Sequence, residues 1–527
     1  MSEKNSSDVV IVGSGIASLV CGAELALKGR RVVVLEREAV AGGCMRTEEV
    51  TLAGFRHDVL SMSLPLFVTA GHYPLLRPVL EQHGLELIYA KVPTAVATPD
   101  GRALLLTQSR AENVRAFDAA AAGDGAAFDQ VLGNIVNNAD LIFGLLGQEP
   151  ASASTLRLLG RQLVRRRVSG MAQFGSEALQ PMRAWLENEF KSDLVKALIA
   201  PWILHTGLSP EATLSALMGK LIIFTLEAAG MPIVKGGIAN LVSAFRSVIE
   251  AHGGQVLTRT DVARVIVEQG VARGVETSDG AIYSARRAVV CNVTPTQLYG
   301  RLLPPDAVPP ATAAMVRRYT YGRGGMQIHI ALSEPPRWRN ERLDGVALIH
   351  LTSGLDAVSR AVNEAERGLL PAEGTIAVGQ PAATDPSRCA PGRSMLWIQL
   401  LELPRTIRGD AAGEIEAPAD GRWNEAVRDA YAARILKRLG QYIVNFDSAT
   451  LAVTSLSPAQ LEQWNMNLVG GDPYSGACSI DQFHLFRPFG SGRNHETPVK
   501  RLFHIGASTH PGHGLSGMSG HMVASKL

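Results

Sequence analysis

Alternating apolar and polar stretches divide the chain into strand-like and helix-like segments from its start. Residues 9–12 (VVIV) form a β-branched run typical of a buried parallel strand, and residues 31–35 (RVVVL) form a second one. Between them the pattern is helical to about Lys28, and Gly29 is placed to end that helix. The opening of the chain therefore predicts the strand, helix and strand unit from which parallel sheets are built.

The period of the pattern changes several times later in the chain. Apolar residues recur three and four apart over residues 109–231, which predicts a block of helices. Residues 299–494 alternate strand-like and helix-like stretches, as in an antiparallel sheet with covering helices. Strand-like runs at 288–292 and 502–505 lead back to the opening unit. The first region is therefore predicted to be assembled from stretches that lie far apart in the sequence.

A glycine turn directly after the first strand indicates a dinucleotide site. Without a Cβ, Gly13 can make the tight turn, and Gly15 lets the backbone approach a pyrophosphate at the helix N-terminus. Glu36 ends the second strand, where an acidic residue is expected to bind a ribose hydroxyl. An acid at this position favours FAD or NAD over NADP. The predicted cofactor contacts in this unit are Gly13, Ser14, Gly15, Ile16, Ala17, Glu36 and Arg37.

Two further glycine-rich segments extend this site. Residues 41–47 (AGGCMRT) supply adjacent glycines and an arginine just beyond the second strand. Residues 506–517 (GASTHPGHGLSG) follow a strand and precede a helix, so their backbone N–H groups and the helix end suit a group that becomes anionic, as a reduced flavin does. The cofactor contacts predicted outside the opening unit are Gly43, Arg46, Val262, Gly506, Leu515 and Ser516.

These patterns predict an α/β fold. A Rossmann-like FAD-binding domain with a parallel sheet is expected from residues 1–108, 232–298 and 495–527. Residues 109–231 are expected to form a helical cap or substrate region, and residues 299–494 a substrate domain of antiparallel sheet and helices. The substrate domain is therefore discontinuous, like the domain that binds the cofactor.

Composition narrows the partners. The chain has 527 residues, 46% hydrophobic and 19% charged, with a formal net charge of +2, so we expect no nucleic-acid partner. Its five cysteines are scattered and include no CxxC pair, which argues against a disulfide framework and a zinc site and favours a reducing compartment. We expect no bound metal, since His510, His513 and His521 have no carboxylate or cysteine at ligand spacing.

The pattern favours a cytoplasmic protein with possible contact to a membrane surface. Residues 1–7 are polar and show no secretory signal, and the most apolar window, 216–234, is interrupted by charges. Residues 156–171 form a basic amphipathic helix, which could lie on an anionic membrane or simply present a solvated or salt-bridging face. The last three residues, SKL, would be a peroxisomal address in a eukaryote and otherwise the end of a helix.

Four segments together resemble the phytoene desaturase-related FAD oxidoreductases, within the amine-oxidase-like superfamily. The segments are residues 13–47, GGIANLVSAFRSVIEAHGG at 236–254, TDPSRCAPG at 384–392 and LFHIGASTHPGHGLSG at 502–517. That group includes bacterial phytoene desaturases, carotenoid isomerases and retinol saturase. The resemblance implies FAD as the cofactor, with residues 42–47 along its pyrophosphate and flavin. It differs at His513, where members often have glycine, and at Ala17, where they often have asparagine.

The resemblance implies oxidation at C–C bonds of a hydrophobic unsaturated substrate, such as a carotenoid-like polyene, by hydride transfer to flavin N5. Oxygen or a quinone would then accept the electrons, since no second strand, glycine turn and helix unit follows to bind NAD. Two alternatives stay open: an oxidase or dehydrogenase of a smaller amine or alicyclic substrate, and a flavin-binding partner protein without catalysis. Candidate catalytic residues are His513, His510 and His57, although His57 could equally be a structural, backbone-bonded histidine.

Overall fold

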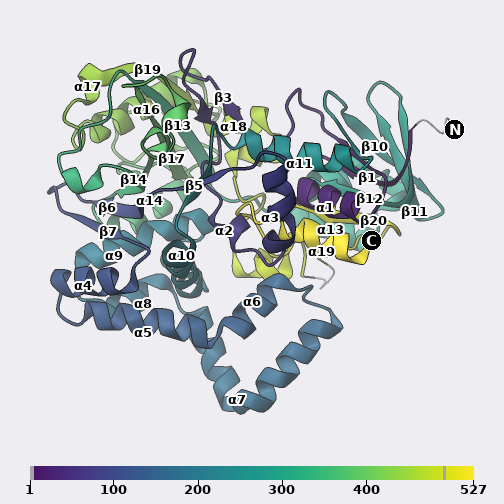
Figure 1. Ribbon diagram of the computed structural model, residues 1–527, viewed down its shortest axis with the longest axis horizontal. Coiled ribbons are helices and arrows are strands. Elements are labelled where there is room, and N and C mark those ends of the chain that lie inside the picture. Colours follow the sequence, from purple (N-terminus) through teal and green to yellow (C-terminus); the bar gives the residue numbers. More distant parts are fainter. Residues whose placement is uncertain (1–4, 491–493) are drawn as a thin grey trace.

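Two seven-stranded sheets organise the molecule, which is a computed structural model describing residues 5–490 and 494–527 (Figure 1). Part of the polar start, residues 1–4, lies outside the described residues. In the first sheet the strand order is β10-β11-β12-β1-β2-β9, and β20 pairs with β12. Its strands are β1 Ser6–Val12, β2 Val32–Leu35, β9 Gln255–Leu257, β10 Val262–Glu268, β11 Val271–Thr277, β12 Ile282–Asn292 and β20 Leu502–Ile505.

The parallel core of the first sheet comes from three distant stretches of chain. β1 pairs in parallel with both β2 and β12, and β12 pairs in parallel with β20. Residues 9–12 are at most 5% exposed, because helices cover the sheet and leave neither side of this strand to solvent. The covering helices are α1 Ile16–Leu27, α11 Ala239–Ala251 and α19 Met518–Lys526. The expected parallel sheet is confirmed.

Helices α1 and α19 lie in very close contact, although they come from opposite parts of the sequence. A Cβ placed on Gly520 would lie 1.9 Å from the carbonyl oxygen of Ala17, so only glycine permits this approach. The N-terminal unit is therefore locked against a helix near the end of the chain.

The second sheet has the order β19-β13-β17-β16-β14-β6-β7 and is antiparallel except where β6 meets β14. Helices α14 Leu355–Glu366 and α16 Glu425–Leu439 pack against it. Its strands are β6 Val92–Ala97, β7 Ala103–Leu106, β13 Gly324–Leu332, β14 Val346–Leu351, β16 Ile376–Gly379, β17 Ser394–Leu403 and β19 Thr450–Leu456. The α/β fold with one parallel and one antiparallel sheet is confirmed.

One part of the predicted domain division is corrected. Residues 1–108 were assigned to the first region, but the hairpin β6–β7 within them belongs to the second sheet, where β6 pairs with β14. Local alternation predicts a hairpin but carries no information on the sheet edge that the hairpin joins. The other boundaries stay predictions.

The helical block predicted over residues 109–231 is helical along most of its length. Its helices are α4 Arg110–Ala120, α5 Asp124–Asn137, α6 Ala139–Gly147, α7 Ala153–Leu179, α8 Met182–Glu189, α9 Asp193–Ile199 and α10 Ser215–Ala229. Helix α7 is bent at Arg167, whose backbone is non-helical (φ 59°, ψ 176°). As a result α7 forms a V that projects at the lower edge of the molecule in Figure 1.

Shorter elements connect these layers. They are β3 Thr47–Glu48, β4 His57–Asp58, α2 Pro65–Val68, α3 Tyr73–Gln82, β5 Leu87–Tyr89, β8 Pro232–Val234, α12 Pro295–Gln297, α13 Pro310–Arg318, β15 Leu369–Leu370, α15 Pro381–Thr384, β18 Gly409–Asp410, α17 Phe446–Ala449 and α18 Pro458–Trp464.

A buried arginine joins the two sheet regions. Arg388 is fully buried and donates from Nη2 to Asp58 Oδ2 over 2.7 Å and from Nε to Asp385 Oδ2 over 2.9 Å. The same Asp385 oxygen accepts from the backbone N–H of Gly236, and Asp58 Oδ1 accepts from that of Ile238. Residues 384–392, one of the segments that carry the family resemblance, thus fix the approach to helix α11.

Candidate active site

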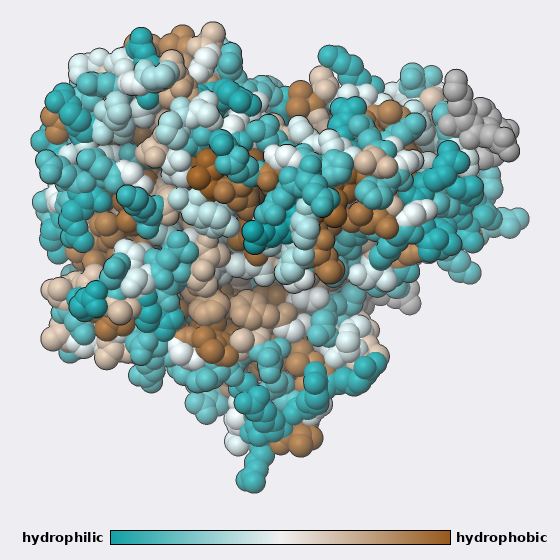
Figure 2. Space-filling model, viewed as in Figure 1, coloured by the Kyte–Doolittle hydropathy of each residue, from teal (hydrophilic) through white to brown (hydrophobic). Residues whose placement is uncertain are grey.

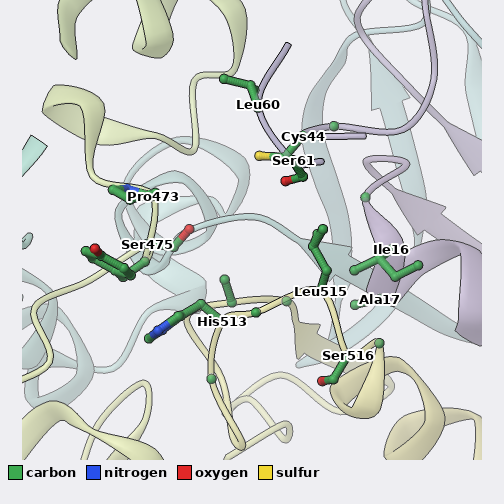
Figure 3. A pocket seen from close by; sticks show the side chains of 18 of the residues that line it. Ile16, Ala17, Cys44, Leu60, Ser61, Pro473, Ser475, His513, Leu515 and Ser516 are labelled. Atoms are coloured by element: carbon green, nitrogen blue, oxygen red, sulfur yellow. The ribbon is translucent and has the colours of Figure 1, made fainter. Parts of the chain in front are cut away.

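A cavity of about 830 Å³ opens where the first sheet meets the second sheet and the helical block. Val12, Leu35 and Asn292 line it, and they stand at the carboxyl ends of β1, β2 and β12. This is the end of a parallel sheet at which ligands bind in such folds. Figure 3 shows part of the lining, with Ile16, Ala17 and Leu515 facing one another across the same space.

The first glycine turn leaves no room for side chains. Gly13 has φ +85°, and a Cβ there would lie 3.0 Å from the carbonyl oxygen of Asn292. A Cβ on Gly15 would lie 2.9 Å from Nδ2 of Asn292. The turn therefore presents bare backbone to the cavity at the start of α1, as a bound pyrophosphate requires.

Glu36 is held in place by the same turn. Its Oε2 accepts from the backbone N–H of Ser14 over 3.0 Å and from Ser14 Oγ over 2.6 Å, and its Oε1 accepts from Glu38 N–H over 2.9 Å. Ser14 Oγ in turn accepts from the N–H of Gly42 over 2.8 Å. These bonds fix a carboxylate at the end of β2 where the sequence predicts the ribose contact.

The second glycine pair lies against the first. A Cβ on Gly43 would lie 3.3 Å from the Cα of Gly15, so the two loops touch backbone to backbone. Arg46 stacks its guanidinium 4.4 Å from the ring centre of Trp464 and pairs with Glu48 over 2.6 Å, while its buried Nε has no partner. An orphaned buried donor beside the cavity suits an acceptor group of a bound cofactor.

The C-terminal turn closes the other side of this end of the cavity. Gly506 donates its N–H to Ser519 Oγ over 2.9 Å, and a Cβ on it would lie 2.1 Å from Asn292 Oδ1. Leu515 adopts a left-handed backbone (φ 59°), and Ser516 Oγ accepts from the N–H of Met518 at the start of α19. The turn thus brings backbone and a helix N-terminus to the cavity, as the sequence predicts.

Every residue predicted to contact the cofactor lines this one cavity: Gly13, Ser14, Gly15, Ile16, Ala17, Glu36, Arg37, Gly43, Arg46, Val262, Gly506, Leu515 and Ser516. Their individual contacts with a cofactor stay predictions. Taken together, a fixed acid, bare glycine backbone and an unpaired arginine donor fit an extended dinucleotide.

The remainder of the cavity is lined by apolar and aromatic side chains. They come from α6, α10, the second sheet and nearby loops and include Phe143, Leu146, Trp202, Met218, Leu221, Ile222, Leu226, Met231, Leu348, Trp397, Leu401, Tyr474 and Phe483. Among the described residues that line the cavity, the carboxylates are Glu36, Glu38 and Asp261. Backbone bonds from residues 259 and 260 to Glu38 and Glu36 place all three at the nucleotide end. The apolar end therefore offers no counter-charge for a cation.

The three candidate catalytic histidines lie in different places. His513 lines the cavity with its ring centre 4.8 Å from that of Tyr474, and burial lowers its pKa well below the ordinary value, so it is neutral (Figure 3). His510 and His57 are not among the lining residues. The carbonyl of His510 accepts from His495 Nε2, and His57 Nε2 bonds to Thr51 Oγ1 over 2.8 Å. The structure brings only His513 to the cavity.

A histidine pair beside the apolar end escaped sequence reasoning. His205 lines the cavity, and its Nε2 lies 3.0 Å from Nε2 of His350 on β14. Burial lowers the pKa of His205 to about 4, so both rings are neutral and one donates to the other. The rings pack on Trp202, at 4.8 and 4.9 Å between centres. No motif marks residues so far apart in the chain.

Comparison with known proteins identifies the family. Residues 16–520 match the family described as flavin containing amine oxidoreductase. The chain belongs to this family. It is an FAD-dependent oxidoreductase, and FAD is the cofactor that the glycine turns, Glu36 and Arg46 are suited to hold. The expected membership in the amine-oxidase-like superfamily is confirmed.

Relatives of this flavoenzyme are distant but extend over the full chain. Pyridine nucleotide-disulfide oxidoreductase domain-containing protein 2 of Mus musculus is 27% identical over 98% of this chain and 92% of its own length. The zeta-carotene-forming phytoene desaturase of Myxococcus xanthus is 24% identical over 96% of this chain and 90% of its own. The solved structure of wild-type putrescine oxidase bound to putrescine has a TM-score of 0.59 at 16% identity, covering 99% of this chain and 98% of that one. The last likeness shows the fold alone.

Proposed function

We propose that this flavoenzyme oxidises a C–C bond of a hydrophobic, unsaturated substrate, of the carotenoid-like polyene or related lipid class. The observation that carries the proposal is the chemistry of the cavity beyond the nucleotide end. It is lined by aliphatic and aromatic side chains and by no described carboxylate, so an apolar chain is accommodated and an ammonium group is not.

The relatives support the same class of substrate. The Myxococcus xanthus protein, which matches almost the whole chain, is a phytoene desaturase. The likeness to putrescine oxidase reflects the shared fold and carries no argument about substrate. We therefore rank an amine or alicyclic substrate second.

The chain's own residues account for binding and for the exclusion of water. Trp202, Trp397 and Phe483 supply broad apolar walls that bind a substrate and keep the site dry. His205 and His350 satisfy one of each other's ring nitrogens and remain neutral, so they add polarity without a charge. FAD, when bound, supplies a two-electron acceptor for the oxidation. We propose oxygen or a quinone as the final electron acceptor.

Anaerobic mixing tests the proposal. Purified holoenzyme is mixed without oxygen with a linear polyene, and in parallel with putrescine or cyclohexylamine, while the visible flavin absorbance is recorded. We expect bleaching with the polyene and none with the amines. Bleaching by an amine together with an unchanged spectrum with every polyene would overturn the assignment. A flavin that responds to neither but is reduced by dithionite would favour a non-catalytic role.

A further inference from the structure

Helix α7 presents an apolar face to solvent. Its inner side is buried at Leu158 and Gln162, whereas Leu156 is 68% exposed and Val164 is 84% exposed. At 100° per residue these two side chains point away from the buried row. Past the bend, Val168 is 74% exposed. In Figure 2 brown side chains lie among the teal ones on the lower projection.

Unpaired arginines flank this apolar face. Helix α7 carries five arginines against a single glutamate, Glu177, whereas the whole chain has a net charge of only +2. Within the described ranges no acidic side chain pairs with the arginines at positions 157, 161, 165 and 167. Arg166 instead bonds to Gln162 and Asn138 and braces the arm. Exposed valine and leucine beside long cationic side chains is the composition of a surface that enters a lipid headgroup layer.

The base of α7 packs against the wall of the cavity. A Cβ on Gly144 of α6 would lie 2.5 Å from Leu158 of α7, so the two helices touch closely. Phe143 and Leu146 of the same α6 line the cavity, and Phe143 is itself 43% exposed. On the other limb of the V, Phe174 packs in one cluster with Leu221, which also lines the cavity. Apolar side chains thus lead from the arm to the substrate end.

We propose that the α7 arm, residues 153–179, docks on the surface of an anionic lipid bilayer and sets the mouth of the cavity against it. Val164 and Val168 enter the acyl boundary, and the arginines bind lipid phosphates. No helix in the described ranges combines the length and apolarity needed to cross a bilayer, so the contact is a surface one. Only the delivery of substrate rests on the proposed function; docking rests on the arm alone.

Charge favours a membrane over a second copy of the chain. A symmetric pair of arms would place the arginines of one copy near those of the other, with Glu177 as the single acid on each helix. Anionic lipids neutralise the same cluster. The arm therefore fits a lipid surface better than it fits itself.

Vesicle flotation tests the docking directly. Full-length holoenzyme is floated with phosphatidylcholine vesicles that either contain or lack phosphatidylglycerol. We expect wild-type protein to float with the anionic vesicles and stay behind with the neutral ones. Charge reversal in Arg161→Glu/Arg165→Glu should weaken binding by roughly tenfold or more, at about 1 kcal/mol for each cation near the surface. Val164→Asn should also weaken it.

A matched control separates the arm from total charge. Arg360→Glu/Arg393→Glu changes the net charge equally at exposed arginines outside the arm that make no ion pair in the described chain, and should bind like wild type. Flavin content and near-UV circular dichroism check that each variant is folded. Absence of wild-type flotation, or equal binding by the arm and control variants, refutes docking. A wild-type dimer that the arm substitutions dissociate, without any vesicle binding, assigns the face to a second copy instead.

Discussion

Arg388 Nη2 lies 2.7 Å from Asp58 Oδ2, and both side chains are at most 1% exposed. The pair connects the loop after β16 to the short strand β4, and through Asp385 it also reaches the turn before helix α11. A segment that the sequence marks only by family resemblance is therefore a buried ionic joint between the regions that carry the cofactor and the second sheet.

Replacing this arginine should destabilise the fold. Arg388→Met leaves Asp58 and Asp385 buried without a cation, which costs about 3–5 kcal/mol. Urea unfolding followed by circular dichroism measures the loss. The control is Arg77→Met, which breaks an exposed pair with Glu81 and should cost less than about 1 kcal/mol. Equal losses in the two variants would contradict the role of the joint.

FAD binding should depend on the first glycine turn and the acid it holds. Gly15→Val places a side chain against Asn292, and Glu36→Ala removes the carboxylate bonded to Ser14. Each should lower FAD affinity by about tenfold or more, the equivalent of about 1.4 kcal/mol. The ratio of flavin to protein absorbance after gel filtration measures it. Gly133→Ala, which meets no atom within 4 Å, is the control. Full flavin retention in both site variants would refute the assignment.

Substitution of His513 should alter substrate binding and leave the cofactor in place. Its ring packs on Tyr474 at the wall of the cavity, so His513→Gly opens space there. We expect unchanged flavin content and a KM for the best polyene that rises by about tenfold, the effect of losing a packed group in an apolar pocket. Steady-state kinetics and flavin absorbance separate the two effects. The exposed His252→Gly should behave as wild type, and flavin loss in His513→Gly would disprove the prediction.

Stability should fall as the pH drops from about 6.5 to about 4. Burial lowers the pKa of His57 to about 3 and of His205 and His329 to about 4, so the folded protein leaves them neutral. Above pH of about 6.5 neither state binds these protons, but below it the unfolded chain does, at up to about 1.4 kcal/mol per pH unit for each histidine. Urea midpoints across this range measure the loss. His329→Gln should flatten the profile, whereas a flat wild-type profile would contradict it.

The cofactor end of the site could be predicted from sequence because its chemistry is local. Gly13, Gly15 and Glu36 stand at fixed spacing around one helix, and backbone geometry dictates their roles. Gly506 and Leu515 repeat the same strand, turn and helix signal near the end of the chain. Such signals need no knowledge of tertiary contacts, and the structure gathers all of these residues at one cavity.

The apolar end could not be predicted in the same way. The periodicity of residues 109–231 predicts helices, yet it does not show that Trp202 meets Trp397 or that His205 meets His350. Those contacts depend on how a helical block docks on a distant sheet. For the same reason the hairpin at 92–106 was assigned to the wrong sheet. His510 and His57 also show that a histidine near a motif need not face the ligand.

The origin of the first sheet in three stretches of chain also bears on biosynthesis. A ribosome releases β1 and α1 first, but their partners β20 and α19 are among the last elements to emerge. Until then Val20, which would lie 2.6 Å from a Cβ on Gly517, and its neighbours on α1 lack their final cover. The nascent nucleotide unit must therefore be shielded, by chaperones or by its own collapse, and flavin can be captured only once translation is nearly finished.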